Sequence, residues 1–186
     1  FCPLLVLGWI YGGIMLIFAP IFGYVIISVI DLFIGENKKD QILNNENINN
    51  YKIILFAWPF IQFFLLFGSI IVICFFDHLS VLEAIILMLV QGMISGAVGI
   101  TFAHELMHQK TKFERFLSDL LMGMAFYGHF RTEHVQVHHR FVGTKKDAVT
   151  ARYNESFYTF FLRVIPECLK SAWKVETSRL SGKNKS

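Results

Sequence analysis

Five of the seven histidines of the chain lie in two short stretches. The first stretch spans residues 104–108 and reads HELMH; the second spans residues 133–139 and reads EHVQVHH. Residues four apart lie on one face of a helix, so His104 and His108 are expected to point the same way. Neutral imidazole is a borderline ligand that suits iron, zinc, copper or nickel. Both stretches therefore have the residue types and the spacing of metal ligands.

The second stretch offers three more imidazoles. His134 and His138 share a face if the segment is helical, with His139 about 100° further round the helix axis. Random placement does not account for two HxxxH patterns in one chain, and burying so many imidazoles without a partner is costly. The two stretches together therefore predict a metal site. The three cysteines lie far apart without a CxxC pair, so neither a thiolate metal site nor a disulfide framework is expected.

The first stretch taken alone also matches HExxH, the pattern of zinc peptidases, in which Glu105 is the general base. This motif is short and gives false positives. It also leaves His134, His138 and His139 without a function. An intramembrane zinc protease is therefore the more distant alternative.

The composition is that of a membrane protein. Of 186 residues, 54% are hydrophobic and 17% are charged, whereas soluble domains are nearer one quarter charged. Residues 1–30 contain no charge, and residues 53–76 and 81–103 are two further apolar runs. Because about 20 helical residues cross the hydrocarbon core, the sequence predicts an all-α, polytopic membrane protein with about three to four spans. Residues 1–34 form either one kinked span or two partial spans around Pro20.

The remaining segments are expected to lie outside the hydrocarbon core. Residues 35–52 read as an Asn-rich polar loop, and residues 104–186 as a histidine-box region on one side of the membrane. Within that region, residues 116–130 predict a re-entrant or interfacial helix, and residues 157–180 predict helices that lie at the membrane interface. The whole chain, 1–186, is assigned to one membrane domain. It begins inside an apolar run without methionine and is expected to be a fragment.

Lysine and arginine are distributed unevenly along the chain. Three of the 17 precede residue 109, all within residues 35–52, whereas the turn at 77–80 has none. By the positive-inside rule, residues 35–52 and the region after residue 109 face the cytoplasm. The basic excess therefore indicates topology and contact with anionic lipid. No nucleic-acid motif accompanies it, and no nucleic-acid partner is expected.

Four segments together resemble one family. HELMH is followed by ERFLSDLLMGMAFYGHF, by EHVQVHH and by DAVTARYNESFYTFFLR. In this order, from about Phe102 to Leu180, they resemble the membrane-bound alkane hydroxylases (alkane 1-monooxygenases) of the membrane fatty acid desaturase/hydroxylase group. The first box of that family normally ends in Lys, where this chain has Gln109. Its second box usually has Gly before the paired histidines, where this chain has Val137. Every ligand-type residue is nevertheless in place.

The resemblance implies a set of iron ligands. Two non-haem iron ions are expected as cofactors, held by His104, His108, His134, His138 and His139. No catalytic residue is expected beyond these ligands. The family has further histidine boxes, whereas no histidine follows His139 in this sequence. The chain is therefore expected to carry part of a di-iron site and to be inactive alone.

Residues near the ligands are expected to support them. Glu105 and Glu133 adjoin ligands and can accept hydrogen bonds that fix the tautomer of an imidazole. His129, in YGHF, lies outside both stretches and is expected in a supporting role. A further support network is expected from three residues that follow the family pattern: Asp147, Arg152 and Glu155.

The resemblance also implies an activity and its partners. The expected reaction is hydroxylation of the terminal methyl group of an alkane to a primary alcohol, with O₂ as co-substrate. Rubredoxin and its reductase are the expected electron donors. The expected location is the bacterial inner membrane, with the histidine boxes on the cytoplasmic side, so that apolar substrate enters from the bilayer. A related membrane di-iron fatty-acyl desaturase or aromatic-methyl hydroxylase is the nearest alternative, because the histidine spacing does not exclude either.

Overall fold

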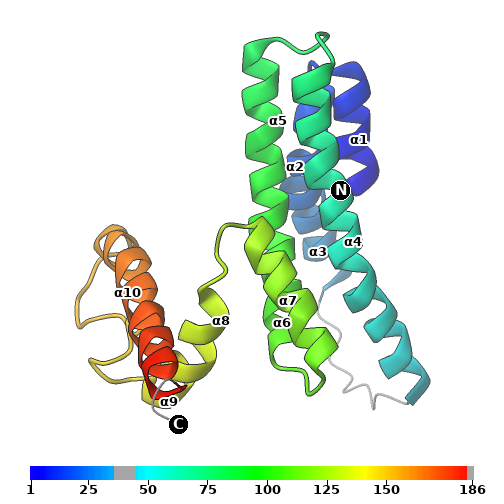
Figure 1. The fold of residues 1–186 in the computed structure, drawn as a ribbon. Helices are drawn as coiled ribbons and strands as arrows, with labels where there is room; N and C mark the ends of the chain where they lie inside the picture. The colour runs from blue at the N-terminus through cyan, green and yellow to red at the C-terminus, as the bar shows by residue number, and fades with distance from the viewer. Residues whose placement is uncertain (36–44, 184–186) are drawn as a thin grey trace. The chain divides into compact units, whose positions relative to one another are not determined.

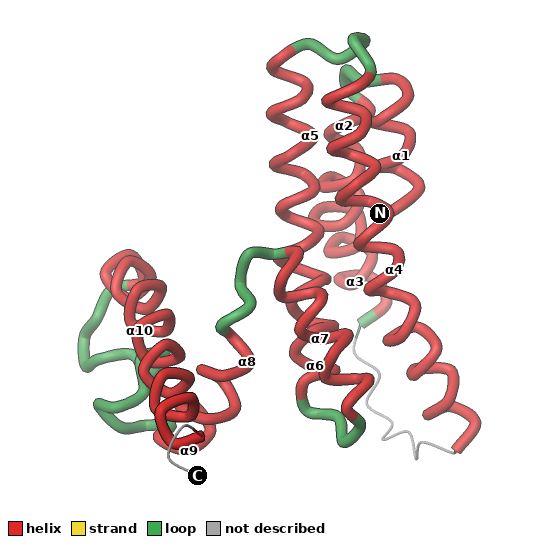
Figure 2. Tube along the Cα trace, viewed as in Figure 1, coloured by secondary structure: helices red, strands yellow, loops and turns green. Residues whose placement is uncertain are grey.

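The computed structural model describes residues 1–35 and 45–183 of the chain. Helices and connecting loops make up this part of the chain, without a strand (Figure 2). The prediction of an all-α protein is therefore confirmed. The chain divides into two compact units, Phe1–Ala125 and Phe126–Ser186.

The first unit contains the apolar helices (Figure 1). In chain order they are α1 (Cys2–Tyr11), α2 (Met15–Pro20), the π-helical turn η1 (Ile21–Ile26), α3 (Ile27–Ile34), α4 (Asn45–Phe75), α5 (Val81–Ile94), the π-helical turn η2 (Ser95–Gly99), α6 (Ile100–Met107) and α7 (Lys112–Met124). Three helical stretches are long and apolar enough to cross a membrane: Met15–Ile34, Tyr51–Phe75 and Val81–Met107. The chain is therefore a polytopic membrane protein.

The prediction of a polar loop at residues 35–52 is wrong from Asn45 on, because α4 begins there. Once a helix has formed, each added residue gains a backbone hydrogen bond, so the apolar span extends into polar sequence. The part of the expected loop at residues 36–44 lies outside the described residues. In residues 1–34 the helix is interrupted at Gly12 and Gly13, which have φ of 59° and 54°, whereas Pro20 lies inside a continuous helix.

Polar contacts hold the short helix α1 and the turn after it against α4, α5 and the turn between them. The Trp9 indole Nε1 donates to Ser69 Oγ at 3.0 Å, and His78 Nε2 lies 2.7 Å from the carbonyl of Trp9. In the turn after α1, Gly13 N donates to Glu83 Oε1 at 2.6 Å. Each contact satisfies a polar group that apolar surroundings would leave without water. The N-terminal segment is therefore tied to α4 and α5 at the end of the bundle away from His104.

The second unit carries the second histidine stretch. Its helices are α8 (Phe130–Glu133), the π-helical turn η3 (His134–His138), α9 (His139–Phe141) and α10 (Phe157–Lys183). The loop at 142–156 returns the chain to the start of α10, and the small core between them consists of Ala148, Val164 and Cys168. Thr132 Oγ1 donates to Glu176 Oε1 at 2.6 Å and so ties α8 to α10.

Candidate metal centre

The first histidine pair lies where the third candidate span ends. His104 is in the last turn of α6, and His108 is the residue that terminates the helix. Their ring centroids lie 4.8 Å apart with the planes at 73°. The i,i+4 spacing therefore brings the two imidazoles together, as the sequence predicts.

Helix α7 packs beside α6 and fixes this end of the span. The buried Ser118 hydroxyl donates to the carbonyl of Ala103 at 2.7 Å, one residue before the first histidine. After the second histidine of the pair, Arg115 Nη1 donates to the carbonyls of Gln109 and Lys110 at 3.2 and 2.8 Å. The backbone is thus held on both sides of the pair.

The start of α7 is set by a capping box. Thr111 Oγ1 accepts from Glu114 N at 3.2 Å and donates to Glu114 Oε2 at 2.6 Å. The same carboxylate accepts from Thr111 N at 3.0 Å. Hydrogen bonds from the Thr111 hydroxyl and backbone hold the pKa of Glu114 below its usual range. The capping box therefore fixes the residue at which α7 begins, and so the position of Arg115 in the first turn.

A groove of about 590 Å³ opens beside His104. Ile54 and Leu55 of α4 line one part of it, and Thr101 and Phe102 line another. Its lining is mainly apolar, and its volume lies in the range of small-molecule sites. The first unit therefore places an apolar groove directly against a candidate ligand.

Glu105 adjoins His104 in the first histidine stretch. Its side chain is exposed, and its carboxylate accepts from Gln109 Nε2 at 2.8 Å. The residue that replaces the usual lysine of the family is thus the partner of Glu105. The expected role of Glu105 in orienting a ligand stays a prediction.

The second histidine stretch has a backbone that the sequence does not reveal. Residues His134–His138 form a π-helical turn, which has more residues per turn than an α-helix. As a result His139, five residues after His134, lies beside it, with 3.0 Å between their Nε2 atoms. The predicted offset of His139, about 100° round from the face of His134 and His138, assumes a regular α-helix, and the π-helical turn brings the ring back beside His134. His138 also remains near His134, with stacked rings 5.3 Å apart.

Aromatic rings support this cluster from one side. Phe130 stacks on His134 with ring centroids 5.1 Å apart, and Tyr127 stacks on Phe130 at 5.2 Å. The neighbouring His129 contacts Tyr127 edge to face at 4.6 Å. Its Nε2 is buried without a hydrogen-bond partner in the described part of the chain, and burial lowers the pKa of His129. A role in support of the ligands remains the prediction for His129.

His138 has a carboxylate partner from the following loop. Its Nδ1 lies 3.0 Å from Asp147 Oδ2, and the Asp147 side chain is fully buried. Asp147 also accepts from Val149 N at 3.1 Å and from the Thr150 hydroxyl at 2.6 Å. The family pattern includes Asp147 in the sequence-based support network, and the structure places it against a candidate ligand.

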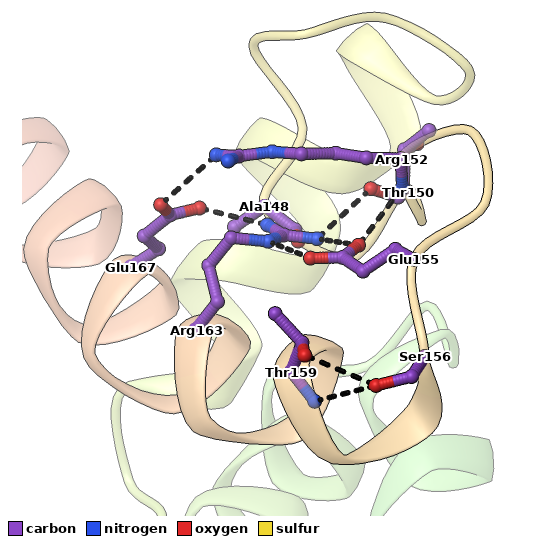
Figure 3. Close-up of polar contacts among 8 residues, drawn as sticks. All are labelled: Ala148, Thr150, Arg152, Glu155, Ser156, Thr159, Arg163 and Glu167. Carbon is purple, nitrogen blue, oxygen red and sulfur yellow. Dashed lines mark hydrogen bonds and ion pairs between the residues drawn. The ribbon is translucent and has the colours of Figure 1, made fainter.

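An arginine of α10 holds this loop, as Figure 3 shows. The Arg163 guanidinium donates to the carbonyls of Ala148 and Thr150 at 2.9 and 3.3 Å, and to Glu155 from both Nε and Nη2 at 2.7 and 2.8 Å. Glu167 accepts from the same group at 2.8 Å. The hydrogen bond from Arg163 is the main reason that the pKa of Glu155 falls to about 2. Sequence reasoning missed Arg163, because an arginine on a helix carries no local signal of a loop contact.

Glu133 is the most buried acid in this unit. Its side chain is fully inaccessible, and neither carboxylate oxygen accepts a regular hydrogen bond from the described residues. Burial, followed by the nearby Asp147 carboxylate, raises the pKa of Glu133. Burial and Glu133 in turn raise the pKa of Cys168 to about 12, which favours the protonated thiol. The carboxylate that contacts His138 is that of Asp147, and the expected role of Glu133 in supporting a ligand stays a prediction.

The donor set fits a borderline transition metal. A pair of neighbouring imidazoles in the first unit and a group of three in the second offer nitrogen ligands without a thiolate. Metal–imidazole bonds of about 2.0–2.2 Å place the nitrogens of two ligands on one ion roughly 3 Å apart. The 3.0 Å between the Nε2 atoms of His134 and His139 meets that spacing.

Fold and candidate ligands together define a class: an all-α, polytopic membrane protein in which each of the two units carries a cluster of imidazoles. Residues 79–183 match the family described as fatty acid desaturase. This match covers more than half of the chain, and the chain belongs to the fatty acid desaturase family, whose members are non-haem iron enzymes.

Named relatives refine this assignment. The chain is 35% identical to alkane 1-monooxygenase 1 of Alcanivorax borkumensis, over 96% of the chain and 44% of the relative. It is 39% identical to an alkane 1-monooxygenase of Ectopseudomonas oleovorans over 58% of the chain and 27% of that relative. A third relative is the xylene/toluene monooxygenase hydroxylase component XylM of Pseudomonas putida, 30% identical over 50% of the chain and 25% of that relative. The resemblance drawn from the histidine boxes is confirmed, and the chain spans less than half the length of these relatives.

Proposed function

We propose that the protein to which this chain belongs is a membrane di-iron alkane monooxygenase. The observation that carries the proposal is the pair of imidazole clusters at the ends of helices, in a chain whose relatives over 96% of its length include an alkane 1-monooxygenase. His104 and His108 supply one part of the ligand set, and His134, His138 and His139 supply another. The remaining ligands of the two iron ions are proposed to lie in segments of the full-length protein that correspond to the part of the relatives this chain does not span.

The reaction is the hydroxylation of a terminal methyl group. One alkane, one O₂, two electrons and two protons give one primary alcohol and one water. The chemistry that bound iron supplies is the activation of O₂. The imidazoles of this chain hold that iron. Each neutral imidazole has one unprotonated ring nitrogen, which can bind a metal ion without first losing a proton.

The groove beside His104 is the proposed binding site for the alkane. Alkane carbons favour apolar surroundings over water by about 0.8 kcal/mol per CH₂. Ile54, Leu55 and Phe102 offer such surroundings next to the first histidine pair. A chain lying in this groove excludes water and presents one end toward His104, which restricts the reaction to that end.

Electrons are proposed to come from rubredoxin, itself reduced by its reductase. Arg140, Lys145 and Lys146 are exposed and lie close in sequence to the second histidine stretch. This basic surface favours the approach of a negatively charged redox protein. The positive-inside rule supports a location of the basic region, and of the histidine boxes, on the cytoplasmic side of the bacterial inner membrane.

The test is metal and product analysis of the natural full-length protein in lipid nanodiscs. We expect about two iron atoms per chain, and 1-octanol from octane when rubredoxin, its reductase and NADH are supplied. In a His138→Ala variant, which removes one proposed ligand, we expect iron content and product to fall together. Stoichiometric zinc without iron, or iron without any alcohol product, would contradict the proposal.

Aromatic-methyl hydroxylation is the second candidate, because XylM is among the relatives. The same preparation supplied with toluene distinguishes the two: benzyl alcohol formed faster than 1-octanol favours this candidate. Fatty-acyl desaturation is tested in parallel by the appearance of a double bond in a supplied acyl chain. The family and relatives found give no support to the zinc protease alternative.

A further inference from the structure

We infer that Asp147 is a positioning residue for the iron site, which fixes the tautomer and the ring orientation of His138. This inference rests on the proposed function, since it concerns a ligand of the proposed iron site. The sequence places Asp147 only in a general support network, and the inference gives it a specific partner and function. The carboxylate comes from a loop, nine residues after the imidazole that it contacts.

The tautomer follows from hydrogen-bond accounting. Asp147 Oδ2 lies 3.0 Å from His138 Nδ1 and accepts from the Thr150 hydroxyl at 2.6 Å. A carboxylate only accepts, so the proton of a neutral His138 ring is on Nδ1. The lone pair is then on Nε2, the nitrogen that faces away from the loop. Asp147 thus holds the imidazole in the form that binds a metal through Nε2.

The orientation is fixed because Asp147 itself has no freedom. Its side chain is fully buried, and its second oxygen, Oδ1, accepts from Val149 N at 3.1 Å. The carbonyls of the residues before and after Val149, Ala148 and Thr150, both accept from Arg163 (Figure 3). Side-chain exposures of 11% for Arg163 and 5% for Glu155 leave little room for water to replace these contacts. The position of His138 is therefore determined from α10 through the loop.

The key variant is Asp147→Asn, which keeps the shape but not the acceptors. An amide has one oxygen and one NH₂ group, whereas the carboxylate has two accepting oxygens. In the asparagine variant, the NH₂ group therefore faces either Val149 N or the pair of His138 Nδ1 and the Thr150 hydroxyl, which lose their acceptor. If the NH₂ group faces His138, it favours the tautomer with the proton on Nε2, and that nitrogen then cannot bind iron. We expect the Fe(II) affinity of the full-length protein to fall about 10- to 100-fold.

The matched control is Ser156→Ala. Ser156 Oγ accepts from Thr159 N at 3.3 Å at the start of α10, in the same unit but away from Asp147. This variant removes one hydroxyl at the start of α10 and keeps Arg163, its loop contacts and the acceptors of His138. Fe(II) affinity is measured by chelator competition, and the Mössbauer spectrum of the iron-loaded protein reports the ligand environment. We expect both to change in Asp147→Asn and neither to change in Ser156→Ala.

Wild-type affinity and spectrum in a folded Asp147→Asn protein would overturn the inference, as would an equal loss of affinity in Ser156→Ala. If Asp147→Asn does not fold, Thr150→Ala and Thr150→Ser decide. Alanine removes the hydroxyl that steadies Asp147 Oδ2, whereas serine keeps it. Lower affinity in the alanine variant alone supports the inference, and equal affinity in both overturns it. Absence of iron from the unsubstituted protein would instead refute the proposed function.

Discussion

Replacing Thr111 with alanine tests whether α7 holds the first histidine pair in place. The substitution removes the oxygen that accepts from Glu114 N at 3.2 Å and donates to Glu114 Oε2 at 2.6 Å. Loss of a threonine N-cap costs about 0.5–2 kcal/mol. Because Thr111 is exposed, water replaces part of what is lost, and we expect about 1 kcal/mol. In a chain of this size that lowers the melting temperature by about 2–4 °C.

The same substitution is expected to weaken iron binding. Arg115, in the first turn of α7, holds the carbonyls of Gln109 and Lys110 directly after His108. When the first turn of α7 frays, these two anchors are lost and the imidazole of His108 samples more orientations. We expect Fe(II) affinity to fall several-fold in the full-length protein, measured by chelator competition in nanodiscs.

The chain provides a matched control at the other end of the span. Ser80 and Glu83 form a capping box of the same type at the start of α5. The continuous helix Val81–Met107 has 27 residues, so this box lies about 40 Å from His108. Ser80→Ala is therefore expected to lower the melting temperature without lowering Fe(II) affinity, and Thr111→Ser to behave as the wild type. If Thr111→Ala and Ser80→Ala lose the same iron affinity, the argument that α7 positions His108 is refuted.

Three further predictions concern the loop, the ligands and the groove. The pKa of Glu155 is lowered from its usual 4.5 to about 2, so the stabilisation it provides is complete above pH 4.5 and is lost as the pH falls toward 2. Glu155→Gln should flatten the pH dependence of the melting temperature in that window; an unchanged profile would contradict the Arg163 contact. His139→Ala should lower the iron content per chain, measured by mass spectrometry, more than His129→Ala does, and equal losses would remove the distinction between ligand and support. Leu55→Trp should fill the groove beside His104 and shift product formation from dodecane toward hexane; an unaltered chain-length profile would place the alkane elsewhere.

The spans could be predicted from the sequence because the bilayer imposes a simple length and hydropathy requirement. The apolar runs expected at 53–76 and 81–103 correspond closely to the candidate spans Tyr51–Phe75 and Val81–Met107. The helix ends were less predictable. Asn45 begins α4 inside a segment whose composition is typical of a loop, because helix extension outweighs the weak local preference of asparagine.

The site could be predicted only where a regular helix relates its members. His104 and His108 are four residues apart on an α-helix, and their contact follows from that spacing. His134 and His139 are five apart, and they meet because the backbone adopts a π-helical turn for which the sequence carries no clear signal. Asp147 reaches His138 through an irregular loop, where no periodicity relates one residue to another.

The chain departs from the alkane hydroxylase pattern at two positions next to candidate ligands, Gln109 and Val137. The contacts of each side chain explain why the residue is tolerated there. Gln109, in place of lysine, donates to the exposed Glu105 carboxylate at 2.8 Å, so a neutral amide pairs with this acid. Val137, in place of glycine, is 5% exposed within the π-helical turn. Full burial of such a side chain is worth about 1.5–3 kcal/mol, whereas glycine contributes no side-chain burial and loses more backbone entropy on folding. The Gln109 side chain donates to Glu105, and the Val137 side chain has no polar atom. Neither departure removes one of the five candidate histidine ligands, so we expect differences in substrate range to arise from the groove.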